Sequence, residues 1–96
     1  MAKSILQKAE NCLVCRSPYC LEEHHVFEGS KRDKSEKYGL KVKLCAFHHR
    51  ISSNSVHLSE DLNKDLKKWS QRKAMQYYGW SVEDFIKNIG KNYLEE

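Results

Sequence analysis

The chain has no apolar run that approaches the roughly 20 residues needed to span a membrane. Its first residues, Met1 to Leu6, contain no hydrophobic signal segment, so a reducing cytoplasm is the expected location. No internal repeat or low-complexity linker divides the sequence. These absences favour a single domain that spans residues 1–96 and does not have a membrane among its partners.

The composition indicates a small domain that needs an additional stabilising element. The chain has 96 residues, of which 40% are hydrophobic and 31% are charged. Domains of this size often depend on disulfides or on a metal. All four cysteines lie between residues 12 and 45, and all five histidines between residues 24 and 57, which favours a metal. The net charge of +4 fits a polyanionic partner without requiring one.

Two short motifs carry paired metal ligands. Cys12 and Cys15 are separated by two residues, as are Cys45 and His48. Zinc binds Cys sulfur and His nitrogen in a tetrahedron, and a tight turn with two residues between its ligands supplies two of the four. The four residues predict a Cys3His structural zinc site, against the alternative of buried thiols and a surface histidine. Cys20 could replace one ligand, but the favoured interpretation is a small apolar residue within a strand.

Residues 1–57 are expected to form the metal-binding core. One strand is expected over residues 20–27, and a second over residues 40–44, where apolar and basic residues alternate as in a half-buried strand. Residues 28–39 between them are a polar, charge-rich loop with room for a helical turn. The second strand should lead into a short helix over residues 46–52.

Residues 58–96 are expected to form a helical scaffold. Ser59 is a suitable N-cap for a long helix over residues 60–78. Ser81 and Asp84 have the spacing of a capping box and predict the start of another helix. The sequence therefore predicts an α+β fold in which a hairpin and a short helix precede two C-terminal helices.

Three further histidines stand beside the predicted zinc ligands. His24 and His25 are adjacent on a predicted strand, so they point to opposite faces and ordinarily cannot share a role. His49 directly follows the second zinc motif and opens a helix, which could lie against the first strand. A second metal could then take one imidazole from each. His57 could be a third ligand or an ordinary loop residue, and both interpretations stay open.

The order of these motifs resembles a known family. The zinc-containing branch of the HNH, or ββα-metal, endonucleases has the pattern seen here as Cys12-x-x-Cys15, His24-His25 and Cys45-x-x-His48-His49. The wider chain is similar to small HNH proteins encoded by phages and prophages, and this similarity covers nearly all of it. The resemblance implies a ββα-metal hairpin-plus-helix core with structural zinc, followed by two C-terminal helices, inside the host cell.

The resemblance also implies a reaction and roles for its residues. His24 and His49 match the ligands of a single divalent metal, and His25 matches the general base of a DNA endonuclease that leaves 5′-phosphate ends. Two imidazole ligands suit Mn²⁺, Ni²⁺, Co²⁺ or Zn²⁺ at least as well as Mg²⁺. The family's middle Asn has no counterpart here, so a backbone carbonyl, Glu36 or Ser35 must brace the base.

The basic residues near the presumed site are expected to bind DNA phosphates; they are Arg32, Lys34 and Arg50. No element has the character of a recognition helix, which predicts little sequence preference. Two alternatives remain. One is a zinc-binding nucleic-acid-binding module of phage origin that is catalytically weak or inactive, and the other is a structural zinc protein of a phage assembly.

Overall fold

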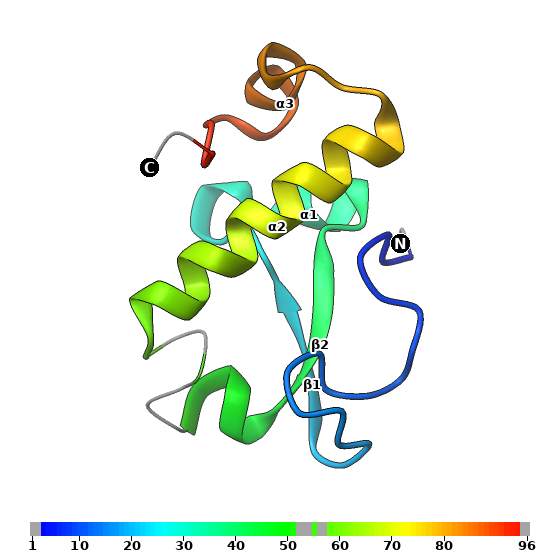
Figure 1. Cartoon of the computed structure of the whole chain (residues 1–96), viewed down its shortest axis with the longest axis vertical. Coiled ribbons are helices and arrows are strands. Elements are labelled where there is room, and N and C mark those ends of the chain that lie inside the picture. Colours follow the sequence, from blue (N-terminus) through cyan, green and yellow to red (C-terminus); the bar gives the residue numbers. More distant parts are fainter. Residues whose placement is uncertain (1–2, 52–54, 56–57, 95–96) are drawn as a thin grey trace.

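The computed structural model describes residues 3–51, 55 and 58–94. It is an α+β fold in which an antiparallel hairpin is followed by helices (Figure 1). Strand β1 (Leu21–His25) pairs with β2 (Lys41–Cys45), in a register that places His25 opposite Lys41. The predicted hairpin is confirmed, with strand bounds within two residues of those expected.

The segment between the strands contains more helix than the single turn expected. A 3-10 turn, η1 (Gly29–Lys31), leads into helix α1 (Arg32–Tyr38), which ends at Gly39 in a left-handed conformation with φ of 71°. The Ser35 hydroxyl of α1 accepts from the Phe27 backbone N–H at 3.0 Å and donates to the Phe27 carbonyl at 2.8 Å. This pair of hydrogen bonds fixes α1 to the chain that leaves β1.

The remaining elements follow the prediction closely. A short π-helical segment, η2 (Phe47–Ile51), follows β2, and helices α2 (Glu60–Tyr78) and α3 (Val82–Ile89) come next. The Ser59 hydroxyl accepts from the Leu62 backbone N–H at 3.2 Å, and Ser81 forms its capping box with Asp84. In the described part of the chain, no helix is both long and apolar enough to cross a membrane.

The core lies between the hairpin and the C-terminal helices. Val42 and Leu44 of β2 are buried, as are Leu66 of α2 and Phe85 of α3. The ring of Phe27, just after β1, meets Phe85 edge to face at a centroid distance of 5.6 Å. Figure 1 shows α2 crossing the hairpin, with α3 beyond its far end. Helix α2 therefore covers the hairpin, and α3 packs against α1 and α2.

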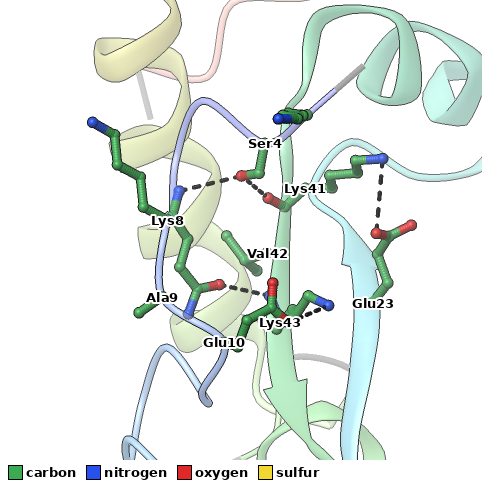
Figure 2. A pocket seen from close by; sticks show the side chains of 10 residues that line it. Ser4, Lys8, Ala9, Glu10, Glu23, Lys41, Val42 and Lys43 are labelled. Carbon is green, nitrogen blue, oxygen red and sulfur yellow. Dashed lines mark hydrogen bonds and ion pairs between the residues drawn. The ribbon is translucent and has the colours of Figure 1, made fainter. Parts of the chain in front are cut away.

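Residues 4–11 form an arm beside β2, without helix or strand of their own. The Ser4 hydroxyl donates to the Lys41 carbonyl, and the Lys43 backbone N–H donates to the Gln7 side-chain oxygen at 2.8 Å (Figure 2). A Cβ at Gly39 would collide with the Lys3 carbonyl, so this close approach requires glycine.

The arm changes the environment of β2 from that expected. The alternation of apolar and basic residues predicted a half-buried strand, but Lys41 is only 6% exposed. The expectation was wrong for this residue because the arm and the Glu36 side chain occupy the face that the pattern assigned to solvent. Lys43 is partly exposed and pairs with Glu10 at 2.8 Å.

Candidate metal centre and histidine cluster

Two segments thirty residues apart bring four metal-binding side chains together. Ligand atoms of Cys12, Cys15, Cys45 and His48 all lie within 4.8 Å of one another. The Cys15 and Cys45 sulfurs are 3.7 Å apart, and His48 Nδ1 lies 3.8 Å from Cys12 Sγ and 3.3 Å from Cys45 Sγ. A tetrahedral ion with Zn–S bonds of about 2.3 Å separates its sulfurs by roughly 3.8 Å. The predicted Cys3His cluster is confirmed, and it could hold a structural metal such as zinc.

The backbone around the cluster favours the thiolate form of Cys12. Burial raises the pKa of the Cys12 thiol, but backbone N–H groups of Cys15, Cys45 and Val14 outweigh this effect and lower the pKa to about 6. Thiolates are the form that binds metals. The Cys12 N–H donates to the Ser17 carbonyl at 2.8 Å, which closes the first turn.

Cys20 is not part of this cluster. It lies just before β1, is exposed, and has a left-handed backbone with φ of 53°. The interpretation of Cys20 as an apolar residue within the strand is therefore wrong, because the strand starts one residue later.

A second cluster contains the other described histidines. His24 of β1 is 2% exposed, and its ring meets that of His49 in η2 edge to face at a centroid distance of 5.2 Å. Both line a cavity of about 290 Å³ together with His25 and Arg32. Glu28 also lines it, with a carboxylate oxygen 3.9 Å from His24 Nε2. The fold thus collects the three predicted histidines around one opening.

Of the other predicted site residues, Lys34 and Arg50 are not among those that line this cavity. Lys34 extends towards the end of α3, where its amine donates to the Ile89 carbonyl at 3.5 Å. Arg50 pairs with Glu22 at 2.9 Å and is more than half exposed. His57, the proposed third ligand, lies outside the described residues.

His25 is held by Glu36, one of the residues considered as a substitute brace. Glu36 Oε1 lies 3.0 Å from His25 Nε2, and Glu36 Oε2 lies 2.7 Å from the Lys41 amine. The Lys41 ammonium, followed by His25, lowers the pKa of Glu36 to about 2. Ser35, the other side chain considered, contacts Phe27 instead. Glu36 therefore stays ionised at neutral pH and accepts a hydrogen bond from His25.

Ligand atoms of Glu23, His25 and Glu36 lie close enough to hold a metal, but a cation is already present. Lys41 extends between the two carboxylates, 2.7 Å from Glu36 and 3.7 Å from Glu23. Figure 2 shows the Lys41 side chain reaching towards Glu23. This group is better described as a buried lysine with its two counter-charges than as a metal site.

Glu22 is a site neighbour that the sequence analysis missed. Glu22 Oε1 lies 2.7 Å from His49 Nδ1, and the Arg50 guanidinium contacts both carboxylate oxygens. The alternation of side chains between the two faces of a strand could have indicated this pairing. Glu22 and His24 share one face of β1, whereas Glu23 and His25 share the other. Each histidine of the pair is therefore preceded by a carboxylate on its own face.

A larger hollow of about 540 Å³ lies between the N-terminal arm and β2 (Figure 2). None of the described residues that line it is a histidine or a cysteine. The chemistry-bearing side chains gather instead in the smaller cavity.

Comparisons of the chain with models of protein families, with curated proteins and with solved structures found no match.

Proposed function

We propose that this chain is a metal-dependent DNA endonuclease of the HNH type. One observation carries the proposal: His24, His25 and His49 line one cavity beside a Cys3His cluster. The chain positions two of these histidines at the end of β1 and the third directly after a cluster residue, His48. This is the arrangement that the resemblance to the family implies.

His25 is proposed as the general base. Because ionised Glu36 accepts a hydrogen bond from Nε2 of His25, the neutral ring carries its proton there and presents the lone pair of Nδ1. Nδ1 takes a proton from a water molecule whose oxygen attacks the phosphorus. The bond from phosphorus to the 3′ oxygen then breaks, which leaves a 5′-phosphate and, after protonation, a 3′-hydroxyl.

His24 and His49 would hold the divalent ion. Two imidazoles within one cavity suit Mn²⁺, Ni²⁺, Co²⁺ or Zn²⁺ at least as well as Mg²⁺. When bound, the ion supplies charge stabilisation to the phosphate and to the leaving oxygen. Arg32, which lines the same cavity, is suited to orient a phosphate through its guanidinium.

The test is plasmid nicking by the zinc-loaded protein. Supercoiled plasmid is incubated in Mg²⁺, Mn²⁺, Ni²⁺ or EDTA, with His25→Ala purified in the same way to control for contaminating nucleases. We expect nicking that depends on the metal and falls by about 10²–10⁴-fold in His25→Ala, the usual contribution of a general base. Circular dichroism and zinc content should be unchanged in the variant.

Other outcomes favour the competing functions. DNA binding at low salt without cleavage in any metal would indicate a nucleic-acid-binding zinc module, in which His25→Ala leaves the binding intact. No DNA affinity at low salt would indicate a structural zinc protein, because phosphate contacts are strongest under those conditions.

A further inference from the structure

The described contacts include a carboxylate directly behind one proposed metal ligand. Glu22 Oε1 and His49 Nδ1 are 2.7 Å apart, and the two residues are separated by 27 positions in the chain. Both side chains are largely shielded, with 31% of Glu22 and 15% of His49 exposed. The contact therefore joins β1 to η2 at the wall of the histidine cavity.

The position of Glu22 is fixed from its other side. Arg50 Nη2 lies 2.9 Å from Glu22 Oε2, and Arg50 Nε lies 3.0 Å from Oε1. Such a two-pronged contact restricts the carboxylate plane. A guanidinium only donates hydrogen bonds, so both Glu22 oxygens act as acceptors in this contact.

A carboxylate acceptor beside Nδ1 determines which ring nitrogen of His49 carries the proton. The neutral imidazole places its proton on Nδ1 and leaves the lone pair on Nε2. Metal-binding histidines commonly donate their second ring N–H to a carboxylate, which fixes the ring and increases its basicity.

We propose that Glu22 is a positioning residue for His49, holding this ligand in the Nδ1–H form so that Nε2 binds the divalent ion. The inference rests on the proposed function, since it assigns the metal to His24 and His49. In this arrangement Arg50 acts behind Glu22, which gives it a role apart from the phosphate contact expected from the sequence.

The first experiment measures Ni²⁺ affinity by calorimetry on zinc-loaded protein. Glu22→Gln keeps the size of the side chain and removes its charge, and we expect about 10- to 100-fold weaker Ni²⁺ binding. Glu10→Gln is the matched control, because it also breaks a surface ion pair, with Lys43, but does not touch a histidine. Its affinity should equal that of the original chain, and zinc content should be unchanged in both variants.

The second experiment reads the His49 ring by long-range ¹H–¹⁵N NMR before Ni²⁺ is added. We expect the Nδ1–H form in the original chain and a mixture of forms in Glu22→Gln. An Nε2–H form in the original chain, or equal Ni²⁺ affinity in the original chain and Glu22→Gln, would overturn the role of Glu22 alone. If the original chain binds no Ni²⁺ beyond its zinc site, the proposed metal site itself fails.

Discussion

Glu36 Oε1 lies 3.0 Å from His25 Nε2, so a carboxylate from α1 orients the histidine at the end of β1. The other oxygen of Glu36 contacts Lys41, which lies directly opposite His25 in the hairpin. The three residues form a chain from a buried ammonium through a carboxylate to the proposed base. This arrangement supplies the bracing for which the sequence offers no asparagine.

The first prediction concerns the charge of Glu36. Glu36→Gln keeps a hydrogen-bonding side chain but no longer places a carboxylate beside His25 Nε2. Nicking should therefore slow by about tenfold or more, up to the 10²–10⁴-fold contribution of a general base. The loss should appear in kcat and leave KM near its original value. Glu83→Gln, at an exposed position of α3, is the control. Equal rates for Glu36→Gln and the original chain would contradict the role.

The second prediction concerns the pH dependence of the Glu36–Lys41 pair. The folded pKa of Glu36 is about 2, below the ordinary value of 4.5. Its contribution to stability is therefore present above pH 4.5 and is lost as the pH falls towards 2. Lys41→Met removes the main cause of the shift, so the pKa should rise towards 4.5.

Carboxyl ¹³C NMR between pH 7 and pH 4 measures this difference directly. The Glu36 signal should stay constant in the original chain and should move in Lys41→Met as protons bind. A Glu36 signal that titrates identically in both proteins would show that Lys41 does not hold the carboxylate in its ionised form.

The third prediction concerns the Cys3His cluster. Cys45→Ser, or removal of the metal by a strong chelator, should abolish the cooperative thermal transition, because structural zinc contributes about 10–16 kcal/mol in small domains. Cys20→Ser is the matched control, since this thiol is exposed and outside the cluster. Zinc content and near-ultraviolet circular dichroism check both variants. A Cys45→Ser protein that melts like the original chain would exclude a structural metal here.

The fourth prediction concerns the hydroxyl of Ser35, which is fully buried. Ser35→Ala leaves the Phe27 N–H and carbonyl without this partner, so the free energy of unfolding should fall by about 2–4 kcal/mol. Ser30→Ala, at an exposed position of η1, should change it by less than about 0.5 kcal/mol. Urea unfolding of both variants gives the comparison, and equal midpoints would show that solvent replaces the hydroxyl.

Local signals were sufficient to predict much of the fold. Ser59 and Ser81 mark the starts of α2 and α3 because an N-cap hydroxyl satisfies backbone N–H groups that the helix itself cannot. The four members of the Cys3His cluster were equally visible, since each pair is separated by only two residues. Helix α1 was underestimated, because its stability comes from Ser35 and Phe27 contacts outside the helix.

Contacts between distant segments were harder to predict. Glu22 reaches His49 across 27 positions, and only the packing of η2 against β1 brings them together. The burial of Lys41 depends on the arm and on Glu36, neither of which alters the alternating pattern of its own strand. The sequence therefore identified the histidines of the site and offered Glu36 as one of several possible braces, but it did not identify Glu22 as the partner of His49.

The N-terminal arm has a consequence for assembly. Along the outer edge of β2, the carbonyls of Gly39, Lys41 and Lys43 and the N–H of Lys43 are already bonded to the arm and the first cysteine turn. A second copy cannot extend the sheet at this edge by strand addition. If the chain cuts both strands of a duplex, the two cuts must come from separate encounters or from a dimer formed through another surface.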